Sequence, residues 1–151
     1  MRRKDRQTDR ESALAVVDGS AFATLALSDG NAPYAVALSI ARIGENLYFH
    51  CAKSGKKIDL LRQNPRVCVS FVGEVIPSER EFATNYCSAV VYGTAEEVTD
   101  VSEKIAVLRA IARRYTPQAE GFDDEIARDL QHVSVWKIPM EEITGKRRTG
   151  I

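Results

Sequence analysis

The sequence predicts a mainly β protein with flanking helices, an α+β class, folded as one domain over residues 1–151. Three observations support this. A chain of 151 residues is one domain's length and buries roughly 70% of its unfolded surface. Short apolar segments are joined by hairpin turns, and helical segments begin with N-cap signals. We therefore expect about six antiparallel strands in a small closed or split barrel, because closure removes exposed strand edges.

The strands are expected where apolar residues alternate or run together between turn signals. Asp29-Gly30-Asn31 is a strong hairpin turn between the first two strands. Residues 66–73 are largely apolar and are expected to be buried on both faces, whereas residues 74–84 are expected to be irregular or edge-like. The full set of expected strands is 21–29, 33–43, 47–52, 66–73, 85–99 and 132–138, with 141–151 continuing the sheet briefly.

The helices are expected where apolar residues recur at helical spacing. Thr8 with Glu11, and Asp100 with Glu103, each have the spacing of a capping box. Ser54 is expected to cap a helix that ends at Asn64, because the next residue is proline. The expected helices are residues 8–17, 55–63, 101–115 and 123–131.

Charge and composition argue against several partners. The 21 basic residues equal the 21 acidic ones, so we expect neither a nucleic-acid partner nor an anionic membrane surface. No apolar run approaches the ~18 residues of a membrane span, and the charged N-terminal segment lacks the apolar stretch of a signal peptide. Three widely spaced cysteines fit reduced thiols. We expect a cytoplasmic protein.

Common catalytic motifs are absent from the sequence. Neither nucleotide-binding fingerprint occurs, no zinc motif is present, and the only histidines are His50 and His132. A nucleophilic Cys51 paired with His50 has poor geometry, because neighbours on a strand point to opposite faces. If the protein is an enzyme, its reactive group is expected to come from a cofactor.

A lysine-rich junction joins the strand at residues 47–52 to the following helix. Lys53, Lys56 and Lys57 lie at the helix start, where the helix dipole disfavours cations by ~0.3–1 kcal/mol each. The unpaired N–H groups and the lysines together could bind a phosphate or another anion. The alternative is that the lysines are simply solvated. Spacing alone leaves both interpretations open.

The residues around this junction resemble a known family. "YFHCAKSGKKIDLLRQNPRVCVSF" is similar to the phosphate-binding segment of the pyridoxamine 5′-phosphate oxidase-like, flavin-nucleotide-binding proteins. "MRRKDR" and "ITGKR" are similar to the branch that includes nitroimidazole-resistance reductases. The resemblance spans nearly the whole chain and favours the anion site. It implies a six-stranded antiparallel split β-barrel of the FMN-binding type, and a homodimer with FMN at the subunit interface.

The resemblance also implies a set of cofactor-binding residues. Lys53 and Lys57 would hold the phosphate, the backbone at residues 37–39 would follow the isoalloxazine, and Tyr86 and Ser88 would approach from the partner chain or line the rim. The set is Ala37, Leu38, Ser39, His50, Cys51, Ala52, Lys53, Lys56, Lys57, Tyr86 and Ser88. The loop at residues 74–86 departs from the version with cysteine and tryptophan in many relatives, which leaves the substrate open. The further arginines that hold pyridoxal phosphate are not found, so oxidation of pyridoxamine phosphate is not expected.

The implied function is an FMN-dependent oxidoreductase. Electrons would pass from a reduced nicotinamide or another donor to a nitro compound, a quinone or a similar small acceptor. His50 is expected to be catalytic, as a proton source near neutral pH. The alternatives are a flavin-binding sensor or carrier without turnover, and a haem- or deazaflavin-binding member of the same barrel. Lys146 and Arg147 are expected to lie in a frayed tail, and Trp136 to pack in the core or a dimer interface.

Overall fold

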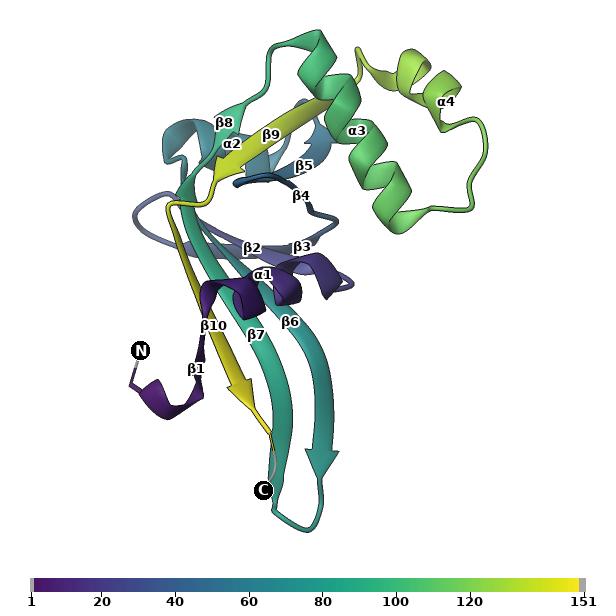
Figure 1. Ribbon diagram of the computed structural model, residues 1–151. Coiled ribbons are helices and arrows are strands. Elements are labelled where there is room, and N and C mark those ends of the chain that lie inside the picture. The colour runs from purple at the N-terminus through teal and green to yellow at the C-terminus, as the bar shows by residue number, and fades with distance from the viewer. Residues whose placement is uncertain (1, 150–151) are drawn as a thin grey trace.

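Two antiparallel sheets form the body of the protein in our computed structural model, which describes residues 2–149. The larger sheet has the order β1-β10-β7-β6-β2-β3 and the smaller one β4-β5-β9-β8 (Figure 1). The strands are β1 (Gln7–Thr8), β2 (Ala23–Ser28), β3 (Pro33–Leu38), β4 (Ala41–Ile43), β5 (Asn46–Ala52), β6 (Arg66–Ser78), β7 (Ala83–Thr94), β8 (Glu96–Glu97), β9 (Val133–Pro139) and β10 (Glu142–Arg148).

Four α-helices and one short 3₁₀ helix flank the sheets. They are η1 (Lys4–Arg6), α1 (Arg10–Gly19), α2 (Lys56–Gln63), α3 (Val101–Tyr115) and α4 (Phe122–Asp129). The predicted class, mainly β with flanking helices in a split barrel, is confirmed. The strand count differs: the described residues contain ten strands, two of them only two residues long, where about six were expected.

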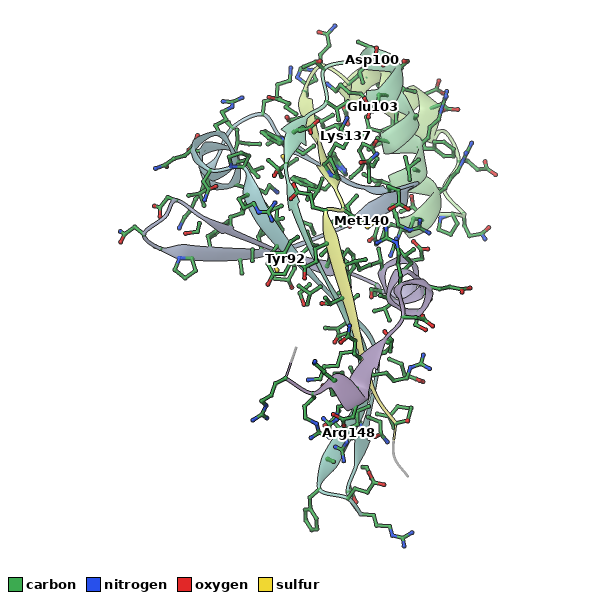
Figure 2. The ribbon with its side chains drawn as sticks, turned by 60° about the vertical axis from the view of Figure 1, so that its left-hand side comes forward. Tyr92, Asp100, Glu103, Lys137, Met140 and Arg148 are labelled. Carbon is green, nitrogen blue, oxygen red and sulfur yellow. The ribbon has the colours of Figure 1, made fainter. Side chains whose placement is uncertain are left out.

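The two sheets are joined where the chain bends from one into the other. One bend separates β3 from β4 and another separates β7 from β8 at Ala95, whose N–H donates to the Pro65 carbonyl (2.8 Å). The third lies at Met140, between β9 and β10, and Figure 2 shows it there. Gly93 packs close to it, since a Cβ on this residue would lie 2.3 Å from the Pro139 carbonyl oxygen. These bends make the split barrel out of strands that would otherwise lie in one sheet.

Apolar side chains from both sheets fill the barrel interior. Leu25, Phe49, Phe71 and Ile138 are almost completely buried there. Val17 of α1 packs into this cluster, and so do Ile58 and Leu61 of α2. Burial of one such side chain contributes about 1.5–3 kcal/mol to stability, so this cluster holds the two sheets together.

A second apolar cluster lies between α3 and the outer face of the smaller sheet. Tyr48 and Val135 from the sheet pack against Val107, Leu108 and Ile111 of α3. This cluster places α3 and α4 over β5 and β9, at the end of the molecule opposite the long β6–β7 arm (Figure 1). Two polar contacts reinforce it: Tyr48 donates to Glu103 Oε1 (2.9 Å), and the Asp100 carboxylate caps α3 by accepting from Glu103 N–H (2.7 Å).

The structure corrects several predicted element boundaries. The first helix begins at Arg10, because the Asp9 carboxylate and not Thr8 accepts the Ser12 N–H. The predicted strand at residues 33–43 is two strands in different sheets. Residues 74–84 are not irregular: they form the ends of β6 and β7 and the turn between them, with a bulge between Val72 and Val75. The edge-like alternative holds at residues 75–78, which pair with β7 alone, because β2 pairs only with residues 68–71 of β6.

Two further predictions were wrong for related reasons. Residues 66–73 are not buried on both faces, since buried residues alternate with partly exposed or exposed ones along this part of β6. Lys146 and Arg147 do not lie in a frayed tail but in β10, where they pair with Ser88 and Cys87 of β7. In both cases the conformation depends on pairing with β7. The hydrophobicity of a segment does not show which strand it will pair with.

Candidate functional site

The junction between β5 and α2 is a tight turn that leaves helix N–H groups free. Gly55 is the N-cap of α2 with φ 123°, a conformation that favours glycine. The predicted cap by Ser54 is wrong: no side chain caps this helix in the structure. The first N–H groups of α2 and the Ser54 hydroxyl therefore remain available to a ligand.

The three lysines of the junction have no acidic partner among residues 2–149. Lys53 and Lys56 are exposed and Lys57 is half-buried, and none of them forms an ion pair in this part of the chain. Aromatic rings orient two of the ammonium groups instead. Lys56 Nζ lies 4.6 Å from the centre of the Tyr34 ring, and Lys57 Nζ lies 5.7 Å from that of Phe49. Positive charge is thus concentrated beside a positive helix end.

The charge of Lys57 affects the pKa of two adjacent residues of β5, His50 and Cys51. Protein atoms crowding the imidazole lower the pKa of His50, and the charge of Lys57 lowers it further. Burial raises the pKa of Cys51, while Lys57 lowers it and Glu97 raises it. His50 is therefore kept largely neutral at pH 7, and Cys51 is kept a thiol.

His50 and Cys51 nevertheless lie on opposite faces of β5. Cys51 lies with Phe49 on the face that packs against the barrel interior, whereas His50 lies with Tyr48 on the face beneath α3 and α4. This is the alternation that a strand imposes. Ala52 is exposed at the end of β5, paired with Val133 of β9.

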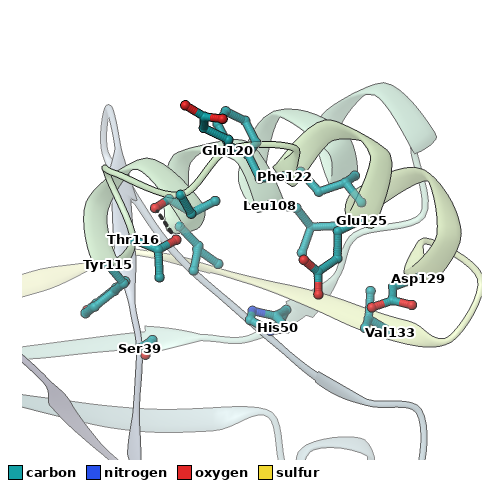
Figure 3. A pocket seen from close by; sticks show the side chains of 14 residues that line it. Ser39, His50, Leu108, Tyr115, Thr116, Glu120, Phe122, Glu125, Asp129 and Val133 are labelled. Atoms are coloured by element: carbon teal, nitrogen blue, oxygen red, sulfur yellow. Dashed lines mark hydrogen bonds between the residues drawn. The ribbon is translucent and has the colours of Figure 1, made fainter.

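His50 opens into a hollow of about 420 Å³ between the smaller sheet, α3 and α4 (Figure 3). Ser39 lines the same hollow. Three carboxylates, of Glu120, Glu125 and Asp129, line it as well. Its apolar walls are formed mainly by Leu108, Ile111, Tyr115, Phe122, Ile126 and Val133.

Tyr115 fixes the segment that carries Ser39. Its hydroxyl donates to the Ile40 carbonyl (2.9 Å) and accepts from the Ile40 N–H (3.0 Å). The C-terminal end of α3 is thereby tied to the bend between β3 and β4. This double hydrogen bond holds Ser39 at the rim of the hollow.

The strand β3 supplies an unpaired backbone edge. It is the last strand of the larger sheet, paired only with β2 within the described residues. Leu38 packs toward the barrel interior, and Ala37 points the other way and is exposed. Backbone N–H and C=O groups on such an edge are free to bind a flat polar ligand.

Tyr86 and Ser88 lie elsewhere in the single chain. They belong to β7, opposite Arg148 and Lys146 of β10, in the arm that Figure 1 shows extending away from α2 and β5. Lys146 Nζ lies 5.5 Å from the centre of the Tyr86 ring. A hydrogen bond from Lys146 lowers the pKa of Tyr86, with help from Arg6. One chain therefore does not bring these two residues to the lysine junction.

Sequence reasoning missed the contribution of α3 and α4 to the site. The helices were predicted, but nothing in their spacing indicates that they cover His50. The closest signal is the helical spacing of the apolar residues Phe122, Ile126 and Leu130. It predicts that one face of this helix packs against another element, and Ile126 and Leu130 do pack against the cluster beneath α3. Residues 2–149 contain no group of three or more potential metal ligands. No helix in this part of the chain is long and apolar enough to cross a membrane.

Solved structures of other proteins share this fold. A candidate 5-nitroimidazole antibiotic resistance protein from Bacteroides thetaiotaomicron is 27% identical, with a TM-score of 0.77 over 92% of this chain and 84% of that one. An FAD and heme binding protein from Mycobacterium smegmatis is 23% identical, with a TM-score of 0.79 over 96% of this chain and 74% of that one. An FAD-binding protein from Mesorhizobium loti is also 23% identical, with a TM-score of 0.71 over 96% and 97% of the two chains.

The sequence was also compared with curated proteins and with models of protein families. No curated protein matches it significantly. The model for pyridoxamine 5′-phosphate oxidase matches residues 9–147, which include the lysine junction, His50 and all the strands except β1 and the last residue of β10. The chain therefore belongs to the pyridoxamine 5′-phosphate oxidase family.

Proposed function

We propose that the protein is a homodimeric FMN-binding oxidoreductase that passes electrons from a reduced nicotinamide or another donor to a small acceptor. The observation that carries the proposal is the excess of positive charge at the β5–α2 junction, where three lysines without an ion pair in residues 2–149 face the single first-turn acid Asp59, in a chain of a family whose structural relatives include flavin-binding proteins. Nitro compounds and quinones are the acceptor classes that we favour. The relative from Bacteroides thetaiotaomicron, named for resistance to a nitroimidazole, supports the first of these.

The junction fits the phosphate of FMN. A bound phosphate would convert the mutual repulsion of Lys53, Lys56, Lys57 and the helix end into attraction. The open space around Gly55, where an added Cβ would meet nothing within 4 Å, lets a ligand approach the backbone. Helix N–H groups without a side-chain cap supply the hydrogen bonds.

The remaining proposed contacts follow the edge of the barrel. The free edge of β3 at Ala37 and Leu38, with Ser39 directly after it, can hydrogen-bond a planar ring system, and Ser39 and His50 share the hollow beside it. Cys51 and Ala52 complete the strand between His50 and the lysines. A bound flavin supplies hydride and electron transfer, and the chain's own groups bind and orient it.

His50 is the proposed catalytic residue, with a role that the structure modifies. Its lowered pKa makes the imidazole largely neutral at pH 7, so it is a proton donor mainly under mildly acidic conditions. An anion bound at the lysines offsets the charge of Lys57 and shifts the pKa of His50 back upward. Phosphate binding and proton supply are in this way coupled through one lysine.

The apolar arm supports a dimer. Val72, Val75 and Ile76 of β6 are each about half exposed, and Phe82 at the hairpin turn is 98% exposed. Such a group of large apolar side chains on one hairpin is typical of a protein interface. In a homodimer the arm would bring Tyr86 and Ser88 toward the partner's lysine junction, as the family resemblance implies.

Three alternatives can be distinguished from this function by experiment. A flavin-binding sensor or carrier would bind FMN but would not turn over with NADH or NADPH. A haem-binding member of the barrel would show a haem spectrum, and one structural relative binds both FAD and heme. A deazaflavin-binding member would prefer that cofactor over FMN.

Removal of the Lys57 ammonium is expected to weaken FMN binding. A charge-assisted hydrogen bond contributes about 1.5–3 kcal/mol, so Lys57→Ala should raise the Kd for FMN by roughly 10- to 150-fold. Fluorescence titration of FMN at low salt measures this. The matched control is Lys4→Ala, which removes an exposed lysine from η1 and should leave the Kd unchanged. Equal affinity in Lys57→Ala and the unaltered chain would contradict the proposed site.

Turnover of the FMN-loaded protein should depend on the protonation of His50. NADH or NADPH is expected to bleach the flavin band, and a nitroaromatic or quinone acceptor to restore it. The rate should fall as pH rises through the pKa of His50, because the proton donor is lost. His50→Gln should flatten this pH profile, and His132→Gln should preserve it. Absence of reduction by either nucleotide would favour the carrier, and an unchanged profile in His50→Gln would remove the histidine's proposed role.

The arm should hold the dimer together. Light scattering is expected to give twice the chain mass, and Val75→Glu should shift the protein toward the monomer, because a carboxylate in an apolar interface loses its hydration. Val101→Glu places the same charge on an equally exposed valine at the start of α3 and should leave the dimer intact. A monomeric unaltered chain, or a dimer unaffected by Val75→Glu, would argue against this interface.

A further inference from the structure

The hollow beneath α4 is a second binding surface with chemistry unlike that of the lysine junction. Its volume of about 420 Å³ accommodates a fused ring system, and its walls are largely apolar. Tyr115 and Phe122 place aromatic rings in the wall. None of Lys53, Lys56 and Lys57 lines it. Its links to the proposed flavin site are Ser39 and His50, and the charge of Lys57 acts on His50.

The hollow carries negative charge that the described residues do not neutralise. Glu120, Glu125 and Asp129 line it, and no ion pair of the structure within residues 2–149 involves any of them. Figure 3 shows Glu125 with its carboxylate turned into the hollow, toward the side where His50 lies. No lysine or arginine is among the lining residues.

Two nearby cations, Arg109 and Lys104, contact other groups and hold the wall in place. Arg109 Nε on α3 contacts Asp123 Oδ1 on α4 at 2.6 Å. Lys104 Nζ donates to the carbonyls of Leu130 and Val133, at 3.2 Å each. These contacts tie α4 to α3 and β9, so the hollow is a built feature of the fold, and its carboxylates are left for a ligand.

A positively charged ligand satisfies these groups better than a neutral or anionic one. Glu120, Glu125 and Asp129 are exposed at the mouth of the hollow, where their charge attracts a cation and repels an anion. The Tyr115 ring already carries the Arg114 guanidinium, 5.3 Å from its centre, so Phe122 is the aromatic side chain of the wall left to attract a cationic ring. Apolar contact with Ile111 and Ile126 requires that the cation also be hydrophobic.

We propose that the hollow between α3, α4 and His50 binds an organic cation with an apolar, flat body. Resting on the proposed flavin function, this makes cationic members of the proposed acceptor classes the preferred acceptors, because the hollow adjoins the lysine junction through His50. The phosphate of a flavin is held at the positive surface and excluded from the negative one. The two surfaces of opposite charge therefore bind different ligands, the flavin phosphate at one and the organic cation at the other.

Three probes with one shared ring test the proposal by calorimetry. They are N-methylquinolinium, quinoline at pH 8, where it is uncharged, and quinoline-4-carboxylate. The full chain is titrated as purified and again after loading with FMN. We expect N-methylquinolinium to bind at least tenfold more tightly than quinoline, the carboxylate to bind most weakly, and the preference to decrease with added salt.

A variant without the three charges should lose this preference. Glu120→Gln combined with Glu125→Gln and Asp129→Asn keeps the shape of the hollow, so quinoline should bind as before while N-methylquinolinium binds at least tenfold more weakly. The matched control is Asp124→Asn, which neutralises an exposed carboxylate of α4 that does not line the hollow. Equal binding of cation and neutral ring by the unaltered chain, or an unchanged preference in the triple variant, would overturn the proposal.

A blocking variant locates the site. Ala112→Phe inserts a ring into the hollow from α3, and should abolish binding of both N-methylquinolinium and quinoline. Cation binding that persists in a folded Ala112→Phe protein, as judged by circular dichroism, would place the ligand elsewhere and overturn the assignment.

Failure of this proposal and failure of the flavin proposal give different results. Loss of the cation preference with intact FMN binding overturns only the use of the hollow. A chain that binds the cation but not FMN, by contrast, keeps the hollow as a cation site and removes the proposed flavin function.

Discussion

The site depends on one electrostatic constraint: three lysines are placed beside the positive end of α2 without an acidic partner in the described chain. This arrangement is unfavourable in the free protein, because like charges and the helix end repel one another. The charge of Lys57 also acts on His50 and Cys51. Burial lowers the pKa of His50 and Lys57 lowers it further, whereas burial raises the pKa of Cys51 and Lys57 only opposes that rise. An anion at the junction would relieve the repulsion and change the protonation of His50 in one event.

The fold keeps this charge apart from the negative hollow. β5 has two faces, one packed into the barrel with Phe49 and the other covered by α3, and the junction follows its end. The bend between β3 and β4, held by Tyr115, brings Ser39 to the same place from the other sheet. Closure of the barrel thus does more than remove strand edges, since it collects residues distant in sequence around one end of a strand.

Much of this could be predicted from the sequence, and the failures have physical causes. The hairpin turn at Asp29-Gly30-Asn31 and the Asp100 cap are local, and so they were predicted correctly. The cap of α2 was not, because Gly55 adopts a positive φ that a serine cap does not explain. The β6–β7 arm and the position of Lys146 depend on strand pairing, and the hollow depends on how α4 packs on α3. Such contacts between distant segments leave little trace in a single sequence, whereas the lysine junction is contiguous and visible.

The central claim is that the junction recognises the phosphate of the cofactor. The most direct measurement compares the affinity for FMN with that for riboflavin, which has the same ring and ribityl chain but no phosphate. The account predicts that FMN binds at least tenfold more tightly at low salt, since two lysines and the helix N–H groups contact only the phosphate. It also predicts that rising salt reduces this difference. Equal affinity for FMN and riboflavin would contradict it.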